Sequence, residues 1–182
     1  MKVELKEYRN PEYHPGAGPV KRILWHVFSK MLIHSQLLVP VGLKLFILKL
    51  FGAKIGAGVM LKPNVNIKHP WFLEIGDYSW IGEDVWIDNL VRVKIGANCC
   101  VSQGALLLTG NHNFSKRTFD LMMGEVILED GSWVGAKAMV CPGVTLKSHA
   151  VLTVNSVATK DCEEYQLYQG NPADSVKMRT IH

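Results

Sequence analysis

Apolar residues recur at every sixth position through most of the chain beyond residue 52. Most repeats also carry a small or thin residue four places after the apolar one, as at Val59, Ser79, Val91 and Ala105. Neither an α-helix nor an alternating β-strand has this period. A six-residue repeat is typical of a parallel β-helix, in which each hexad forms one flat face of a coil. We therefore predict an all-β fold whose inward-facing positions are Ile55, Leu61, Ile67, Ile75, Ile81, Ile87, Ile95, Val101, Leu107, Leu128, Val134, Val140, Leu146, Leu152 and Ala158.

The series of apolar positions is irregular at three places. The steps from Ile67 to Ile75 and from Ile87 to Ile95 are eight residues long, which predicts a bulged corner in two successive coils. A much longer gap separates Leu107 from the next member of the series, so residues 108–127 are expected to leave the coil as an extruded loop. Loops of this length inside a domain are usually functional or disordered. This one contains too many apolar groups for a disordered linker.

The two ends of the chain depart from the repeat. Residues 1–52 predict a helical cap, with apolar residues at helical spacing over residues 21–33 and 41–51 and a stop at Gly52. An uncovered end of a β-helix exposes its core and its unpaired strand edges, so a repeat fold needs such a cap. We divide the chain into a cap (1–52), a β-helix (53–159) and a C-terminal tail (160–182).

Composition limits the possible partners. The 182 residues are 48% hydrophobic and carry a net charge of only +4, and no nucleic-acid-binding motif is present. We therefore expect no nucleic-acid partner. The four cysteines lack the spacing of a disulfide framework or a zinc site, and the polar N-terminus does not resemble a signal peptide. These features favour reduced thiols and a cytoplasmic location.

The most apolar stretch, residues 37–51, is too short to span a membrane and is interrupted by Pro40 and Lys44. One interpretation is that it packs on the β-helix or in a subunit interface. The alternative is a weak association of residues 21–51 with the inner surface of a membrane.

Several segments, in order, carry a resemblance to a known family. Besides the hexads, these are LFGAKIG (50–56), TGNH (109–112), EDGSWVGAKAMVCPGVTL (129–146), SVATKD (156–161) and GNPA (170–173). They resemble the hexapeptide-repeat acyltransferases, especially the maltose, galactoside and Nod-factor O-acetyltransferases and the acetyltransferases of colanic acid and other exopolysaccharides. The resemblance covers nearly the whole chain beyond residue 20. It implies a left-handed parallel β-helix, an exception to the right-handed crossover rule, and a homotrimer with active sites between subunits.

His112 is the leading candidate for catalysis. Acyl transfer from a thioester to a hydroxyl needs a base, and histidine suits that task near neutral pH. The resemblance gives this role to the histidine of the extruded loop, with direct attack by the acceptor on the thioester. Glu125, where the loop returns, is expected to orient the imidazole, and the alternative is a solvated hinge residue.

Three polar residues are candidates for the acceptor site. Asp88 and Asn89 precede the bulged corner, and Asn111 precedes the histidine. In the resembled family, polar residues in the region of Asp88 and Asn89 face the acceptor sugar. The alternative for these two is an Asx pair that only shapes a turn.

The resemblance also implies acetyl-CoA as co-substrate. Trp133 is expected to face outward, because its neighbour Val134 is in the inward register, and to flank the pantetheine arm. Small residues let that arm lie close to the backbone, and cations beside the groove suit the phosphates of coenzyme A, although a solvated charge is the alternative for each cation in the tail. The sequence departs from the family at Val-Asn-Ser (154–156), where alanine-glycine-serine is usual. The expected cofactor-binding residues are Trp133, Ala136, Val154, Thr159, Lys160, Lys177 and Arg179. The sequence leaves open whether Lys177 or Arg179 is the cation of the tail.

The function expected from these features is acetyl-CoA-dependent O-acetylation of a saccharide hydroxyl, in an exopolysaccharide or a sugar precursor. No metal site is expected, because the histidine spacing of the γ-class carbonic anhydrases, which share the fold, is absent. Two alternatives remain: N-acetylation of an amino sugar or nucleotide sugar, and a non-catalytic β-helix that serves as a scaffold or binding module.

Overall fold

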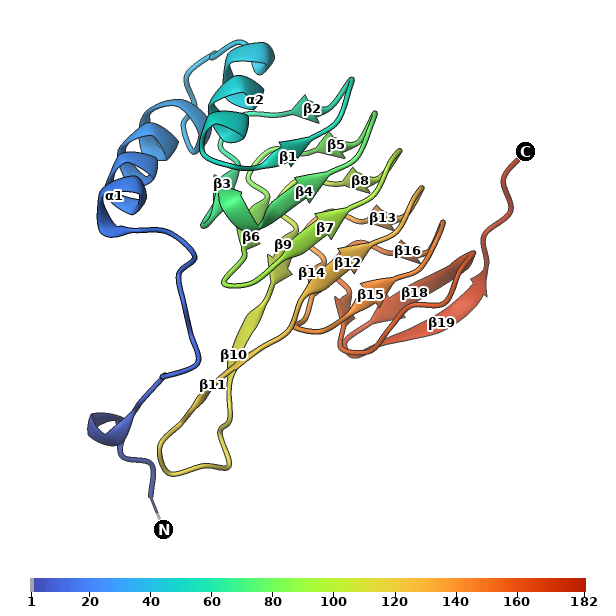
Figure 1. Ribbon diagram of the computed structural model, residues 1–182. Coiled ribbons are helices and arrows are strands. Elements are labelled where there is room, and N and C mark those ends of the chain that lie inside the picture. The colour runs from blue at the N-terminus through green and yellow to red at the C-terminus, as the bar shows by residue number, and fades with distance from the viewer. Residues whose placement is uncertain (1) are drawn as a thin grey trace.

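The hexads form short parallel strands that stack into a left-handed β-helix with three flat faces (Figure 1). The computed structural model describes residues 2–182. Face A consists of β1 (Lys54–Ile55), β4 (Leu73–Ile75), β7 (Val93–Ile95), β12 (Val126–Leu128) and β15 (Thr145–Leu146). Face B consists of β2 (Met60–Leu61), β5 (Trp80–Ile81), β8 (Cys100–Val101), β13 (Trp133–Val134), β16 (Val151–Leu152), β18 (Gln166–Gly170) and β19 (Ala173–Met178). Face C consists of β3 (Asn66–Ile67), β6 (Trp86–Asp88), β9 (Leu106–Leu108), β14 (Met139–Val140) and β17 (Val157–Ala158).

The inward-facing residues stack in columns through the coils. Ile75, for example, pairs with Ile55 on one side and with Ile95 on the other, and Ile95 pairs with Leu128. All but one of the predicted inward positions are buried; Ile55, in the first coil, is half-buried. The predicted register is therefore confirmed, and the hydrophobic effect acts on nearly every sixth residue.

The eight-residue steps lengthen the strands of face A. In β4 and β7 both end residues point inward, so that Leu73 and Val93 are buried together with Ile75 and Ile95. Val91, one of the small or thin residues of the repeat, is half-buried, whereas Val93 is buried in the core. The physical reason is that alternate residues of a three-residue strand share a face.

A left-handed backbone recurs at the corner between faces A and B and at the corner between faces B and C. The corner between faces B and C has positive φ at Asn64 (58°), Asp84 (57°), Gly104 (66°), Lys137 (55°) and Asn155 (57°). Asn and Asp tolerate this conformation better than most residues, and glycine adopts it without strain. Asn155 therefore fits its corner in the Val-Asn-Ser segment that departs from the resembled family.

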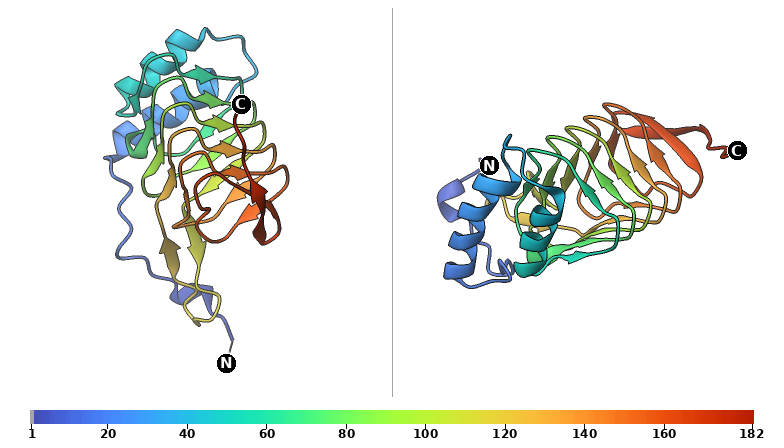
Figure 2. Two further views of the ribbon diagram at one scale, coloured as in Figure 1. Left: turned by 90° about the vertical axis from the view of Figure 1, so that its right-hand side faces the viewer. Right: turned by 90° about the horizontal axis from the view of Figure 1, so that it is seen from above.

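Helices cover the N-terminal end of the coil (Figures 1 and 2). They are α1 (Pro19–Phe28), continued by the π-helix η2 (Ser29–Ile33), and α2 (Val41–Leu50), while short 3-10 turns lie at η1 (Leu5–Glu7) and η3 (Pro70–Phe72). The helices predicted over residues 21–33 and 41–51 are therefore present. Trp25, Ile47 and Leu48 join the buried core of the coil. The indole Nε1 of Trp25 donates to the carbonyl oxygens of Ile67 and Lys68, both at 3.1 Å.

The extruded segment is an antiparallel hairpin of β10 (Gly110–His112) and β11 (Leu121–Met123) that projects away from the coil (Figure 1). The N-terminal segment runs beside it: the N–H of Glu4 donates to the carbonyl of Arg117 at 2.9 Å, and Arg117 forms ion pairs with Glu4 and Glu7. The tail is also ordered, since β18 and β19 form a second antiparallel pair that continues face B.

Candidate active site

His112 ends the first strand of the projecting hairpin and pairs with Leu121. Its imidazole Nδ1 lies 2.9 Å from the carbonyl oxygen of Phe119. A carbonyl can only accept a hydrogen bond, so Nδ1 carries a proton, and in the neutral imidazole Nε2 keeps a free lone pair. This is the tautomer that a general base needs.

The imidazole of His112 is also held by stacking. The ring of Phe119 lies parallel to it, with centroids 4.4 Å apart and an interplanar angle of 7°, and the ring of Tyr8 lies 5.9 Å away. The side chain of Asn111 accepts the backbone N–H of His112 at 2.8 Å. Asn111 therefore shapes the strand beside the histidine while its side chain remains exposed.

Glu125 does not orient His112 within the subunit. The hairpin pairs His112 with Leu121 and Gly110 with Met123, so Glu125 lies beyond the base of the hairpin. Four residues of strand separate it from the partner of His112, which is about 13 Å. Its carboxylate is exposed and lies 3.9 Å from the guanidinium of Arg92. Within the subunit Glu125 therefore does not take the predicted orienting role, because the Phe119 carbonyl already occupies Nδ1 of His112.

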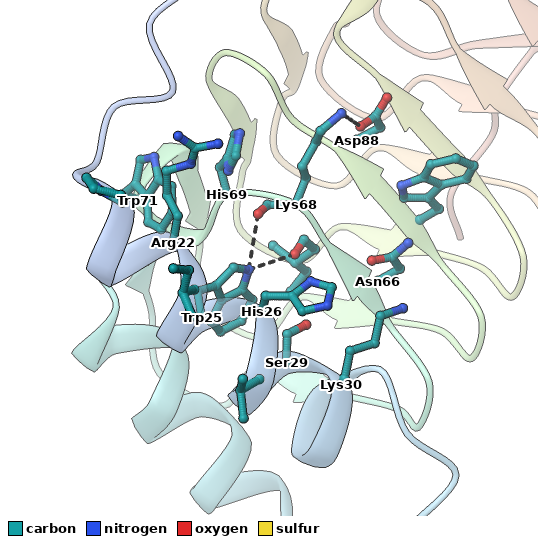
Figure 3. Close-up of a pocket in the computed structure, with 15 residues that line it drawn as sticks. Arg22, Trp25, His26, Ser29, Lys30, Asn66, Lys68, His69, Trp71 and Asp88 are labelled. Carbon is teal, nitrogen blue, oxygen red and sulfur yellow. Dashed lines mark hydrogen bonds and ion pairs between the residues drawn. The ribbon is translucent and has the colours of Figure 1, made fainter.

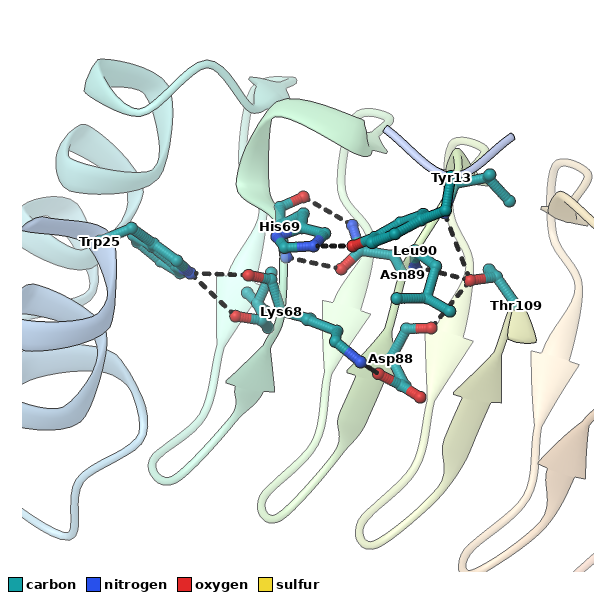
Figure 4. A network of polar contacts seen from close by, with 10 residues as sticks. Tyr13, Trp25, Lys68, His69, Asp88, Asn89, Leu90 and Thr109 are labelled. Carbon is teal, nitrogen blue, oxygen red and sulfur yellow. Dashed lines mark hydrogen bonds and ion pairs between the residues drawn. The ribbon is translucent and has the colours of Figure 1, made fainter. Parts of the chain in front are cut away.

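Asp88 and Asn89 have different surroundings although they are adjacent (Figure 4). Asp88 ends β6, and its Oδ1 lies 2.8 Å from the Nζ of Lys68. Asn89 is completely buried: its Oδ1 accepts the backbone N–H of His69 at 2.9 Å, and its Nδ2 donates to the His69 carbonyl at 2.6 Å. Asn89 thus clamps two coils together, and the expectation that it contacts an acceptor is corrected.

His69 links the N-terminal segment to this clamp. Its Nε2 is 2.9 Å from the hydroxyl of Tyr13, and the residue is only 8% exposed. Burial is the main reason that the pKa of His69 falls to about 4, and the nearby charges of Lys68 and Arg22 lower it further. The imidazole is therefore neutral at physiological pH.

His69 is expected to make the fold sensitive to acid. Between pH 6.5 and pH 4 the unfolded chain binds a proton at this residue and the folded chain does not, so stability present above pH 6.5 is lost as the pH falls. From the pKa of about 4 we expect the wild type to lose about 2–3 kcal/mol more than His69→Gln over this range. Urea unfolding at pH 7 and pH 4.5 measures the difference. Parallel losses in the two proteins would contradict the assignment.

Some of the residues that are predicted to bind coenzyme A lie close together on the last coils. Trp133 faces outward from β13, 44% exposed as predicted, and its Nε1 donates to the hydroxyl of Ser102 at 2.9 Å. Ala136 and Val154 occupy the same corner one coil apart, where the N–H of Asn155 donates to the Ala136 carbonyl at 3.0 Å. The half-buried Ala136 and the exposed Val154 leave backbone at this corner accessible.

The remaining candidates lie at other places. Thr159 and Lys160 are exposed just after β17, at the next corner, and Lys177 is exposed on β19. Arg179 is used differently: its Nη1 donates to the carbonyls of Gly131 (2.9 Å) and His149 (3.1 Å), at the corner between faces A and B. The prediction of a free cation for coenzyme A is therefore corrected for Arg179, because its guanidinium fastens the tail to the coil.

Several residues that could contact a ligand were not predicted from the sequence. Trp80 and Trp86 face outward from β5 and β6, immediately before the inward-facing Ile81 and Ile87. The hexad register contains this signal, since the residue before each inward position points away from the core. The Lys68–Asp88 ion pair was also missed, although the two residues are twenty positions apart and so occupy adjacent coils.

Within residues 2–182, no cluster of His, Cys, Asp and Glu side chains is arranged to hold a metal ion. In the same part of the chain, every helix is too short or too polar to cross a membrane.

The left-handed β-helix built from hexads is the fold of solved hexapeptide-repeat acetyltransferases. No family model matches the chain. The chain is 31% identical over 97% of both sequences to a protein of Escherichia coli (strain K12) described as "Putative colanic acid biosynthesis acetyltransferase WcaF", and it belongs to that family of acetyltransferases.

Solved structures with the same fold include a hexapeptide-repeat acetyltransferase of Vibrio cholerae O1 biovar eltor complexed with acetyl coenzyme A. It has a TM-score of 0.83 and 18% identity over 97% of both chains. A galactoside acetyltransferase in complex with coenzyme A has a TM-score of 0.79 and 20% identity, covering 89% of this chain and 82% of its own.

Proposed function

We propose that the protein transfers an acetyl group from acetyl-CoA to a hydroxyl of a saccharide, with His112 as the general base. The observation that carries the proposal is the hydrogen bond from Nδ1 of His112 to the Phe119 carbonyl, which in the neutral imidazole leaves the lone pair on Nε2. The family relative named for colanic acid biosynthesis supports a saccharide acceptor. The solved relatives that hold acetyl-CoA or coenzyme A support the donor.

The reaction needs no enzyme nucleophile. The acceptor oxygen attacks the thioester carbonyl while its proton passes to Nε2 of His112. The tetrahedral intermediate collapses, the carbon–sulfur bond breaks, and the leaving sulfur of coenzyme A takes the proton from the imidazolium. The products are the acetyl ester and coenzyme A, and His112 returns to its starting state. Asp88 and Asn111 are the residues that we assign to the acceptor side.

The donor is assigned to the corner formed by Ala136 and Val154, with Trp133 beside it and with Lys160 and Lys177 as cations for its phosphates. Free acetyl-CoA at one hundred times its Kd should stabilise the folded protein by about 2.7 kcal/mol, which a thermal shift detects. Trp133→Ala is expected to reduce this shift, because the exposed indole no longer flanks the pantetheine arm. Tyr78→Ala, an exposed aromatic at another corner, is the matched control. An absent shift in the wild type would favour the scaffold alternative.

We propose a homotrimer on the basis of the three outward surfaces. Face A is partly charged, with Lys54, Glu74 and Lys94 paired across its first strands. Faces B and C carry different apolar ladders: Met60, Trp80, Cys100 and Trp133 on face B, and Leu106, Met139 and Val157 on face C. A cyclic trimer joins two different patches of each subunit, which two unlike apolar faces can supply.

We further propose that the helical cap rests on an anionic membrane surface, on the cytoplasmic side where acetyl-CoA is available. Residues 13–73 contain eight Lys and Arg residues and no Asp or Glu, although the whole chain contains 16 acids. The same region exposes an unusual number of large apolar side chains. They are Val20, Ile23, Leu24, Val27, Phe28, Met31, Leu37, Leu38, Leu43, Phe46 and Leu50. Apolar insertion combined with basic charge is the pattern of interfacial helices.

Sedimentation with lipid vesicles tests this surface. The wild type is expected to bind phosphatidylglycerol vesicles and to leave phosphatidylcholine vesicles largely unbound, because only the former attract basic segments. Binding should weaken between 0.1 M and 1 M salt, since the Debye length falls from about 10 Å to about 3 Å. Phe46→Asp on α2 should reduce binding, whereas Val176→Asp on β19 should not. Equal loss in both variants would argue against a role for the cap.

A further inference from the structure

A cleft of about 680 Å³ lies between α1 and the outer surface of the first coils (Figure 3). Side chains of α1 and η2, including Arg22, His26 and Lys30, line one side. Asn66 and Asp88 from face C lie on the opposite side. This volume is within the usual range for small-molecule sites.

Two polar atoms in the wall of this cleft lack good partners. His69 Nδ1 is buried without a hydrogen bond, and Asp88 Oδ1 is buried and receives no well-directed one, although Lys68 Nζ lies 2.8 Å away as an ion pair. No other buried side-chain nitrogen or oxygen within residues 2–182 is left in this state. Buried polar groups are normally satisfied, so a wall with incompletely satisfied atoms marks this cleft as a candidate ligand site, although both atoms lie beneath the surface that a ligand touches.

The charge of the cleft favours an anion. Asp88 is the one carboxylate among the described residues that line it, and Lys68 already neutralises this group. Arg22 and Lys30 contribute two further positive charges from exposed positions on the helix side. Arginine and lysine form strong charge-assisted hydrogen bonds with carboxylates and phosphates.

One aromatic ring in the wall is available to a ligand. Trp86 is 46% exposed on face C and lines the cleft, whereas Trp25 and Trp71 use their indole N–H groups to hold the fold. An exposed indole presents an apolar face with a polar edge, which suits the mixed surface of a sugar ring.

The cleft also adjoins the catalytic hairpin. Asp88 pairs with Leu108 in face C, and the hydroxyl of Thr109 donates to the Asp88 carbonyl at 2.8 Å. The strand that carries His112 begins at the next residue, Gly110. The cleft thus ends at the second coil, one coil before the coil from which the hairpin leaves.

We infer that this cleft binds a saccharide that carries a carboxylate or a phosphate, with Arg22 and Lys30 holding the anion, Trp86 stacking on a ring and Asp88 accepting a hydroxyl. The acceptor of the acetyl group is therefore an acidic or phosphorylated saccharide rather than a neutral one. Only the identification of this ligand as the acceptor rests on the proposed function.

Isothermal titration without acetyl-CoA tests the inference on the full chain. The probes are a disaccharide ending in glucuronate, its counterpart ending in glucose, glucose 1-phosphate and glucose. At least one anionic probe should bind at least about tenfold more tightly than its neutral counterpart. Whether this is the glucuronate disaccharide or glucose 1-phosphate distinguishes a carboxylate from a phosphate as the preferred anion. The double variant Arg22→Gln/Lys30→Gln should weaken that binding by about tenfold or more. Lys94→Gln, which removes the same kind of charge from face A, should leave it unchanged.

Equal binding of anionic and neutral probes would overturn the inference, as would no binding of either anion or an unaffected double variant. The proposed function fails in a different way. If the anionic probe binds and the double variant weakens it, but no acetyl transfer to any saccharide occurs, the cleft assignment stands and the acetyltransferase assignment falls.

Discussion

His112→Ala is expected to lower the rate of acetyl transfer by about 10²–10⁴-fold, the usual contribution of a positioned general base. The imidazole is the group whose tautomer is fixed by the Phe119 carbonyl, and alanine leaves nothing at that place to accept the acceptor proton. The measurement is release of free coenzyme A thiol in the presence of a working saccharide acceptor.

The variant must lose activity without losing structure. His112 is on a projecting hairpin and not in the core, so the melting temperature and the sedimentation of His112→Ala should match those of the wild type. His14→Ala, at an exposed histidine of the N-terminal segment, is the matched control and should retain its rate. A His112→Ala protein with wild-type activity would remove histidine from the mechanism.

Ile95→Ala is expected to destabilise the fold by about 2–5 kcal/mol, as large-to-small changes in a packed core do. Ile95 is 1% exposed in β7 and is stacked between Ile75 and Leu128 in the middle of the column. A cavity there has coils on both sides that cannot collapse into it without breaking their hydrogen bonds. Urea unfolding measures the loss.

The neighbouring residue supplies the control for this prediction. Lys94 points outward from the same strand, so Lys94→Ala should change stability by no more than about 0.5 kcal/mol. Comparable losses at both positions would mean that the register inferred for face A is wrong.

The candidate site was only partly predictable from the sequence. His112 could be found because a gap in a regular repeat marks the residues that leave the coil. The partner of its imidazole could not, since a backbone carbonyl has no sequence signature and Phe119 reaches it only through the hairpin pairing. Glu125 is predicted from its position near the end of the loop, but the pairing of the hairpin strands places it beyond the base of the hairpin, away from His112.

Adjacent residues in the sequence also received opposite roles. Asp88 and Asn89 differ by one position, yet the first faces the cleft and the second is buried as a clamp on His69. Arg179 could be recognised as a cation in the tail, but the return of the tail across the coil decides that it binds the carbonyls of Gly131 and His149.

The sequence by itself determined the β-helix, its register and the position of the extruded segment, because a repeated burial pattern is a local property that recurs in every hexad. Only the tertiary structure decided which elements pack against each other. The pairing of α1 with face C creates the cleft with Arg22, Lys30 and Trp86, and the hairpin sets the tautomer of His112. Such contacts join residues tens of positions apart, so they depend on how the elements pack and leave no period in the chain.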